Sequence, residues 1–328
     1  MYKFDVVALG ELLIDFTNNG ISSQGNTLFE ANPGGAPCNV LSMLNKCGKR
    51  TAMIGKVGED TFGSDLRFVL DNLGIDTSNL VTDNKVPTTL AFIHTIKDGD
   101  REFSFYRNPG ADVMLREEEV KEELIENARI FHFGSLSLTH EEIRKATKKA
   151  IKIAKRNSLI ISFDPNLREP LWDSLELAKV QISYGLSQCD VLKIADNELL
   201  WFTDETNFDD AINKIKQEYN IPLILLTMGK EGSRAYYKNL CVEAPPFLQE
   251  NTIETTGAGD TFLGCCLNYI LEHGMDNLIE NNLLEMITFG NAAASIITTR
   301  RGALCVMPGR LELESLIETE NRQITFNH

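Results

Sequence analysis

Residues 254–264, ETTGAGDTFLG, place Gly257, Ala258 and Gly259 directly before an acid, Asp260. An apolar run follows the acid, which predicts that a helix begins here. The N-terminus of a helix carries unpaired N–H groups and a partial positive charge, so an anion can bind there. Small residues let that anion approach the backbone closely. The stretch therefore predicts an anion site with a carboxylate beside it.

This arrangement suits phosphoryl transfer. The N–H groups would hold the charge that develops on the transferring phosphoryl group, while Asp260 would take a proton from the attacking hydroxyl. The alternative is an ordinary helix start whose acid favours the helix dipole, which is at least as common for a single G-A-G-D. The sequence has no GxGxxG after its first predicted strand and no GxxxxGK[ST]. Neither a Rossmann site nor a P-loop is therefore predicted.

Short apolar runs recur along the chain and alternate with helical patterns. Continuous apolar strands are typical of parallel sheets covered on both faces, so the sequence predicts an α/β fold with a mainly parallel sheet. The expected strands are Phe4–Leu9, Thr51–Ile54, Ile130–Phe133, Leu159–Phe163, Asp190–Ile194 and Leu223–Thr227. The expected helices are Asn39–Cys47, Phe62–Leu73, Glu141–Lys155, Phe208–Tyr219, Gly257–Glu272, Leu283–Ile297 and Glu312–Glu320.

One segment departs from this alternation. Thr88–Thr95 and Arg101–Tyr106 flank Asp98-Gly99, a strong hairpin turn. Two strands alone are only marginally stable, so Ile14–Phe29 is expected to supply partner strands. These pieces predict a small β lid that is discontinuous in sequence (approximately residues 14–31 and 86–112). The lid would belong to a single domain of residues 1–328.

Composition narrows the class of protein. The 328 residues carry a formal net charge of −15 and are 43% hydrophobic. An acidic surface disfavours nucleic acid and anionic membrane as partners. Seven scattered cysteines without a CxxC spacing indicate reduced thiols. The sequence shows no signal peptide and no apolar run of membrane-spanning length, so we expect a cytoplasmic protein.

Two further stretches carry polar residues at predicted turns. In NPGGAPCNV, residues 32–40, glycines and prolines preset a turn before Asn39, which would either cap a helix or bind a sugar. In FDPNLREPLW, residues 163–172, Arg168 follows a predicted strand, where ligands of open α/β sheets collect. The alternative for Arg168 is a surface ion pair with Glu169 or Asp173.

Together these stretches resemble the ribokinase-like (PfkB) sugar kinases over nearly the whole chain. The glycine pair with its following asparagine matches the first family signature, and TTGAGDTFLG matches the second. GELLIDF, IGKVGEDTFG, REFSFYRNPGAD, IFHFGSLSL and DPNLREPLW are similar to segments of the fructokinase branch. The resemblance implies a three-layer α/β/α core with a β lid. It also implies transfer of phosphate from ATP to the primary hydroxyl of fructose, with Mg²⁺ as cofactor.

The resemblance also implies roles for individual residues. For phosphoryl transfer they are Asp260 as base, Gly257, Ala258 and Gly259 as anion hole, and Arg168. For the sugar they are Asp15, Gly34, Gly35, Asn39, Phe105, Arg107 and Asn166. For the nucleotide they are Thr227, Gly229, Gly232 and Asn291. Glu198 resembles an acid that holds magnesium through water, and a potassium site would involve Glu254, Thr256 and Gly302.

The chain departs from the family pattern at two of these sites. Glu254 stands where the second signature usually has Asp, and that Asp contributes to the monovalent-cation site of relatives that have one. Ala195 replaces a polar residue near Glu198, which weakens the expected magnesium site. Purely structural roles are the alternatives for three other positions: Asp15 could cap a turn, Phe105 could pack within the lid, and Asn291 could satisfy a buried backbone group.

Other functions remain as alternatives. A kinase of 2-keto-3-deoxygluconate would need a cation for the sugar carboxylate, and Arg107 or Arg168 could supply it. A nucleoside kinase fits the fructokinase-like segments less well. A non-catalytic sugar-binding protein would be favoured by loss of Asp260 or of the glycine loop, but both are present. An NAD-dependent enzyme is disfavoured by the missing fingerprint. We expect a homodimer formed through the lid.

Overall fold

The computed structural model describes residues 2–95 and 101–326. Its main sheet has nine strands in the order β13-β12-β11-β10-β9-β8-β1-β4-β5. From β11 to β5 every neighbouring pair is parallel, while β12 and β13 add an antiparallel edge. The bounds are Val6–Leu9 (β1), Thr51–Gly58 (β4), Asp76–Asp83 (β5), Ile130–Gly134 (β8), Ile160–Asp164 (β9), Val191–Ala195 (β10), Leu223–Thr227 (β11), Ser233–Tyr237 (β12) and Leu240–Ala244 (β13).

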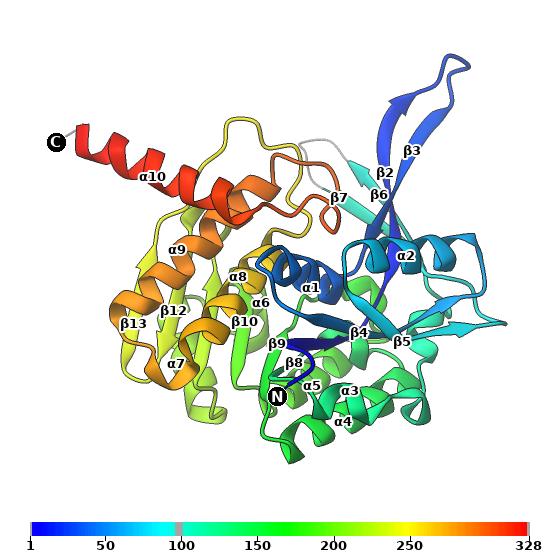
Figure 1. Ribbon diagram of the computed structural model, residues 1–328, viewed down its shortest axis with the longest axis horizontal. Coiled ribbons are helices and arrows are strands. Elements are labelled where there is room, and N and C mark those ends of the chain that lie inside the picture. The colour runs from blue at the N-terminus through cyan, green and yellow to red at the C-terminus, as the bar shows by residue number, and fades with distance from the viewer. Residues whose placement is uncertain (1, 96–100, 327–328) are drawn as a thin grey trace.

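Helices cover both faces of this sheet, giving three layers (Figure 1). Alternate residues of a strand point to opposite faces: Val7 and Leu9 of β1 enter one apolar core, while Val6 and Ala8 enter the other. The first core is completed by α3 (Glu122–Glu126), α4 (Glu141–Arg156), α5 (Leu175–Leu186), α6 (Asp196–Thr203) and α7 (Phe208–Glu218). The second is completed by α1 (Ala36–Lys46), α2 (Thr61–Asn72), α8 (Ala258–His273) and α9 (Glu280–Ile297).

A separate four-stranded sheet, here called the lid sheet, has the order β3-β2-β6-β7. Its strands are Leu13–Ile21 (β2), Thr27–Gly34 (β3), Leu90–Thr95 (β6) and Arg101–Tyr106 (β7). The long β2–β3 ribbon projects from the main body (Figure 1). The expected hairpin strands and their expected partners are thus both present. The turn predicted at Asp98-Gly99 lies outside the described residues.

The remaining elements are short or peripheral. The helix α10 (Arg310–Phe326) packs against α9 through Leu313. Single 3₁₀ turns occur at Ala111–Met114, Glu117–Glu119, Ser135–Leu138, Glu169–Leu171, Gly229–Glu231 and Met275–Asn277. Within the described part of the chain, no helix is long and apolar enough to cross a membrane. The strands and helices expected from the sequence are present, most of them within a few residues of the expected bounds, although α10 extends well beyond the expected end at Glu320. The elements β5, β12, β13, α3, α5 and α6 were not expected.

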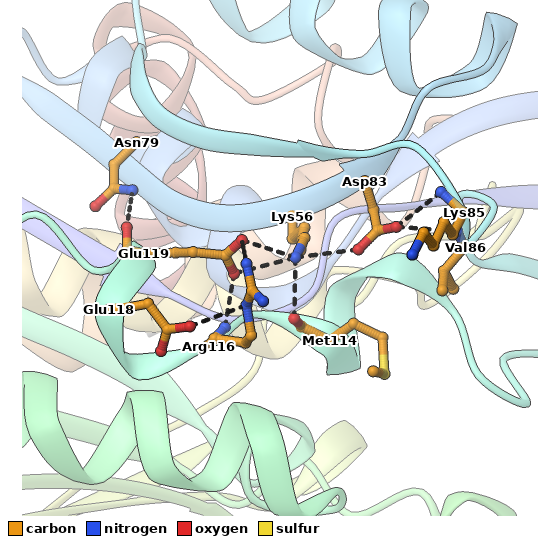
Figure 2. Close-up of polar contacts among 9 residues, drawn as sticks. All are labelled: Lys56, Asn79, Asp83, Lys85, Val86, Met114, Arg116, Glu118 and Glu119. Carbon is orange, nitrogen blue, oxygen red and sulfur yellow. Dashed lines mark hydrogen bonds and ion pairs between the residues drawn. The ribbon is translucent and has the colours of Figure 1, made fainter.

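A buried lysine on the main sheet ties together the segments that flank the β6–β7 strand pair of the lid sheet (Figure 2). Lys56 lies on β4, and its side chain is only 4% exposed. Its ammonium lies 3.1 Å from Asp83 Oδ2, just before β6, and 2.9 Å from Glu119 Oε1, after β7. It also donates to the Met114 carbonyl oxygen at 3.1 Å. One cation therefore holds the segment that leads into β6 and the segment that follows β7.

We expect Lys56→Met to lower the free energy of unfolding by about 3–5 kcal/mol, because breaking a buried ion pair leaves uncompensated buried charge. Urea denaturation of the two proteins measures this difference. The matched control is Lys145→Met, which removes a half-exposed lysine that pairs with Glu141 on the helix surface. The control should change stability little. A Lys56→Met protein as stable as the wild type would contradict the expectation.

Candidate functional site

Two cavities adjoin at the carboxyl ends of the parallel strands, where ligands of open α/β sheets bind. The inner cavity, about 340 Å³, is lined by Glu11, Leu13, Asp15, Gly35, Ala36, Asn39, Phe105, Leu136, Asn166, Arg168, Lys193, Thr255, Thr256, Gly257, Gly259 and Asp260. The outer cavity, about 610 Å³, includes Thr227, Gly229, Gly232, Ala258, Asn291 and Ser295 in its lining. Lys193, Thr255 and Gly259 line both. The N-terminus of α8 therefore stands at their junction.

Gly257 and Gly259 both have close neighbours, and the backbone conformation of Gly257 itself favours glycine. Gly257 precedes α8 with φ 77°, a left-handed conformation that favours glycine. A Cβ atom on Gly257 would lie 2.4 Å from Ala303 Cβ, and one on Gly259 would lie 2.8 Å from Lys193 Nζ. The helix begins at Ala258, one residue later than expected. The loop is thus shaped to bring bare backbone to the cavity junction.

Asp260 lies in the first turn of α8 and is only 8% exposed. One of its oxygens, Oδ2, accepts a hydrogen bond of 2.8 Å from Asn39 Nδ2. Burial raises the pKa of this carboxyl above its usual value, while the Asn39 hydrogen bond and the Lys193 and Arg168 charges oppose the rise. Asn39 is itself buried in the first half of α1. The hydrogen bond therefore joins the two signature segments across 221 residues of sequence.

Lys193, a residue not predicted from the sequence, extends from β10 beneath the glycine loop. Its side chain is 7% exposed, and Nζ lies 3.1 Å from Asp164 Oδ2 at the end of β9. Burial raises the pKa of Asp164 to about 7, although the Lys193 charge opposes this rise. Burial would lower the pKa of Lys193, but Asp164, Glu198 and Asp260 outweigh it and the pKa is raised. The available signal was a single lysine inside the otherwise apolar run VLKIA.

The lid sheet supplies one wall of the inner cavity. Asp15 of β2 and Phe105 of β7 are both paired with Ala91 of β6, so they are neighbours on one face of the lid sheet. Burial raises the pKa of Asp15 to about 7, with Arg168 opposing and Glu254 and Asp260 adding to the rise. A Cβ atom on Gly34 would lie 2.2 Å from Asp15 Oδ2, so only glycine fits beside this acid.

The loop after β9 supplies the opposite wall. Asn166 and Arg168 line the inner cavity, as expected. Both oxygens of Glu198 accept backbone hydrogen bonds, one from Leu167 N at 2.6 Å and one from Ala195 N at 3.0 Å. Glu198 therefore fixes the segment that carries Asn166 and Arg168. Across residues 2–95 and 101–326, no cluster of three or more His, Cys, Asp or Glu is arranged to hold a metal.

Not every expected residue reaches a cavity. Arg107 is not among the lining residues of either cavity; its guanidinium lies 2.6 Å from Asp112 Oδ2, and both side chains are almost fully buried. It also donates to the Leu136 carbonyl oxygen at 3.2 Å. Its contacts are therefore with the protein, and any effect on a ligand would pass through these partners.

The residues expected to hold potassium lie together near Asp15. Glu254, Thr256 and Gly302 line a very small cleft of about 10 Å³ with Gly34. Glu254 Oε1 accepts a hydrogen bond of 3.0 Å from Gly302 N. The carboxylate thus links the segment before α8 with the loop after α9.

The four residues expected to bind nucleotide all line the outer cavity: Thr227, Gly229, Gly232 and Asn291. Gly232 has φ 92°, and a Cβ atom there would lie 2.2 Å from the Ala244 carbonyl oxygen. Asn291 donates to the carbonyl oxygens of Ala244 and Pro245 at 3.1 and 2.9 Å. It therefore satisfies buried backbone groups and lines the cavity as well.

Similarity to known proteins identifies the family of this chain. The family model described as "pfkB family carbohydrate kinase" matches residues 3–308. The chain belongs to the pfkB family of carbohydrate kinases. It is 39% identical over 317 residues to a probable fructokinase-2 of Arabidopsis thaliana, covering 96% of each chain.

Two solved structures extend the similarity within the pfkB family. A fructokinase from Xylella fastidiosa with bound ATP has a TM-score of 0.88 and 28% identity, covering 97% of this chain and 99% of that one. A fructokinase from Vibrio cholerae O395 with fructose, ADP and calcium bound has a TM-score of 0.86 and 26% identity, covering 95% and 99%. The expected family and the expected fold are therefore confirmed.

Proposed function

We propose that the protein transfers the γ-phosphoryl group of ATP to the primary hydroxyl of fructose, giving fructose 6-phosphate and ADP. The observation that carries the proposal is the buried Asp260 at the junction of two cavities, beside the bare backbone of residues 257–259. The names of the relatives support fructose as acceptor, and the ligands named for the Xylella and Vibrio enzymes support a nucleotide and a divalent cation.

The sugar would occupy the inner cavity. Asp15 would accept hydrogen bonds from its hydroxyls. Gly34 and Gly35 would let the sugar approach the backbone closely, and Asn39 would form hydrogen bonds with it. Phe105 would cover it from the lid sheet, and Asn166 and Arg168 would contact it from the loop after β9. Arg107 would act on the sugar indirectly, through the lid connection that it holds with Asp112. Closure of the lid would exclude water, which otherwise competes as acceptor.

Proton transfer and charge stabilisation are assigned to separate groups. Asp260 would take the proton from the primary hydroxyl as the new P–O bond forms, and Asn39 keeps its carboxylate oriented. The N–H groups of residues 257–259 would hold the charge on the transferring phosphoryl group. The Lys193 ammonium stands directly beside Gly259, so it would stabilise the same charge. Arg168 would contribute from the sugar side.

The nucleotide would occupy the outer cavity, with its phosphates toward Thr227, Gly229 and Gly232 and its adenine near Asn291. Mg²⁺ usually keeps several waters and is held mainly by substrate phosphates, so it needs few protein ligands. Glu198 fits a water-mediated role, because each oxygen accepts one N–H and retains a lone pair. When bound, Mg²⁺ would neutralise charge on the phosphates. Potassium would bind beside Glu254, Thr256 and Gly302.

The test is an ADP-release assay with Mg-ATP against fructose, ribose, glucose, 2-keto-3-deoxygluconate and adenosine, with and without potassium. We expect efficient turnover of fructose. Glu11 and Asp15 both line the inner cavity and would repel the carboxylate of a sugar acid, which disfavours 2-keto-3-deoxygluconate. Preferred turnover of another sugar would overturn the choice of fructose, and no turnover of any acceptor would overturn the kinase activity.

We also propose a homodimer formed through the face of the lid sheet opposite the inner cavity. Phe16, Phe29 and Tyr106 gather around Phe92 there, with ring centroids 4.8–5.4 Å from that of Phe92. Phe29 and Tyr106 are exposed. An exposed aromatic cluster is typical of a protein interface.

A charge on this face should weaken the dimer. In sedimentation velocity we expect the wild type to be dimeric at micromolar concentration and Tyr106→Asp to shift toward monomer, because the aspartate must be desolvated at the interface. Leu311→Asp on α10, which is similarly exposed but outside the lid sheet, is the control and should stay dimeric. A monomeric wild type would refute the proposed dimer.

A further inference from the structure

Glu11 is a buried acid in the lining of the inner cavity for which no direct contact with the sugar has yet been assigned. It follows β1, an interior parallel strand between β8 and β4, and is only 4% exposed. It lines the inner cavity together with Asp15, Asn166 and Arg168. Buried glutamates are rare unless their oxygens are paired, so each oxygen needs an explanation.

The two carboxylate oxygens of Glu11 have different surroundings. Oε1 accepts a hydrogen bond of 2.9 Å from Ala36 N, at the start of α1. Oε2 is buried, and no donor to it occurs within residues 2–95 and 101–326. One oxygen is therefore fixed by the protein, while the other is a buried, unsatisfied acceptor on a residue that lines the inner cavity. Leaving a buried acceptor unpaired costs about 1–3 kcal/mol, so a bound partner would recover free energy.

We propose that Glu11 Oε2 is a sugar-recognition group, which accepts a hydrogen bond from a hydroxyl of the bound acceptor sugar. This proposal rests on the proposed kinase function and names one specificity-determining contact within it. A sugar hydroxyl fits because it is a donor and carries no charge. The hydrogen bond of Oε1 to the helix start holds the carboxylate in one orientation, so the contact would be formed without further ordering of the side chain.

The electrostatics around Glu11 support a neutral polyol as its partner. Burial raises the pKa of Glu11 to about 7; its own backbone N–H, the Arg107 charge and the Ala36 hydrogen bond oppose the rise, while Asp112 adds to it. Asp15, the other acid of the inner cavity wall, has a pKa raised to about 7 as well. A hydroxyl donor would favour the ionised form of Glu11, whereas an anionic ligand would oppose it. The pair of acids therefore selects for sugars rich in hydroxyls.

The test is a thermodynamic cycle between Glu11→Gln and deoxygenated substrates. Glutamine keeps the side-chain volume and can still accept from Ala36 N, but its amide N would replace Oε2 and cannot accept. For D-fructose we expect KM to rise by ~10–100-fold, the equivalent of a hydrogen bond to a charged group, with kcat within a few-fold. The assay is repeated with 1-deoxy-, 3-deoxy- and 4-deoxyfructose. One of these should show the same KM with both enzymes, because it lacks the hydroxyl that Glu11 binds.

A purely structural role for Glu11 would give a different pattern, with KM raised to the same extent for every sugar. That pattern, or an unchanged KM for fructose, would overturn this proposal while leaving fructose phosphorylation in place. If the wild type turns over no sugar, the proposed function fails and this proposal fails with it. Glu272→Gln, at the far end of α8 where Glu272 pairs with Lys49, is the control and should match the wild type.

The Gln variant must also fold, because Glu11 holds the start of α1. Its melting temperature is therefore compared with that of the wild type. If it does not fold, Glu11→Asp provides the same cycle, because the shorter acid keeps the charge but withdraws the oxygens from the sugar. It should again raise the KM of fructose and spare one deoxy analogue. Equal losses for all analogues would overturn the proposal here as well.

Discussion

Asp260→Asn should bind fructose and Mg-ATP nearly as well as the wild type and lose at least ~10²–10⁴-fold in kcat, the contribution of a positioned general base. Asparagine is isosteric with aspartate, and its side-chain oxygen can still accept from Asn39 Nδ2. It cannot take a proton from the sugar hydroxyl. The packing at the start of α8 is therefore kept, while the proton acceptor is removed.

Steady-state kinetics separate these effects. A loss in kcat with little change in either KM identifies an interaction made only in the transition state. Asp190→Asn is the matched control, because it makes the same chemical change at the amino end of β10, away from the site. Asp190 accepts a hydrogen bond from Ile161 N there. Near wild-type turnover of Asp260→Asn would remove this residue as the base, whereas an equal loss in both variants would point to a stability effect.

The pH dependence gives an independent check on Asp260. Burial raises its pKa, so the ionised form that can accept a proton is present above that raised pKa and is lost as the pH falls through it. The kcat of the wild type should therefore decline on the acid side at a higher pH than an ordinary aspartate would give. The residual rate of Asp260→Asn should lack this decline. An identical acid limb in both proteins would assign the titration to another group.

The parallel core could be predicted because each of its strands is buried on both faces. Such strands appear in the sequence as continuous apolar runs, as in Ile130–Phe133 and Leu223–Thr227. The two signature segments could be recognised in the sequence because glycine occurs where neighbouring atoms leave no space for a side chain, as at Gly257 and Gly34. The edge strands β5 and β13 give a weaker pattern, because parts of them face solvent and carry polar side chains. The buried strand β12 beside β13 begins with the polar pair Ser233-Arg234, which interrupts its apolar pattern.

The remaining site residues could not be predicted because their roles depend on contacts far apart in sequence. Glu11 becomes notable only when one of its oxygens is found unpaired beside a cavity. Arg107 was expected to reach the sugar, but its partner Asp112 is identified only by the fold. Lys193 gave a local signal, a charge in a buried strand, but its position beneath Gly259 depends on α8, which begins 65 residues later.

Lys193→Met should lower kcat by ~10²–10³-fold, the usual effect of removing one preorganised group that stabilises charge in the transition state. The ammonium lies beside Gly259, at the junction of the two cavities, where the phosphoryl group would pass from nucleotide to sugar. Methionine keeps the apolar stem and removes the charge. The KM of fructose should change little, because the charge that Lys193 would stabilise develops on the phosphoryl group during transfer.

Lys193→Met also affects Asp164, because Lys193 Nζ lies 3.1 Å from Asp164 Oδ2. The substitution would leave this buried carboxylate without its cation and could lower stability as well as kcat. The double variant Lys193→Met/Asp164→Asn removes both charges, so it separates lost catalysis from lost stability. Lys56→Met is the matched control, since it removes another buried lysine with two carboxylate partners, and its kcat should stay within a few-fold of wild type. If the double variant folds stably and keeps the wild-type kcat, Lys193 is a structural ion-pair partner of Asp164. If kcat falls in both Lys193 variants while Lys56→Met is spared, the Lys193 charge acts on the transferring phosphoryl group.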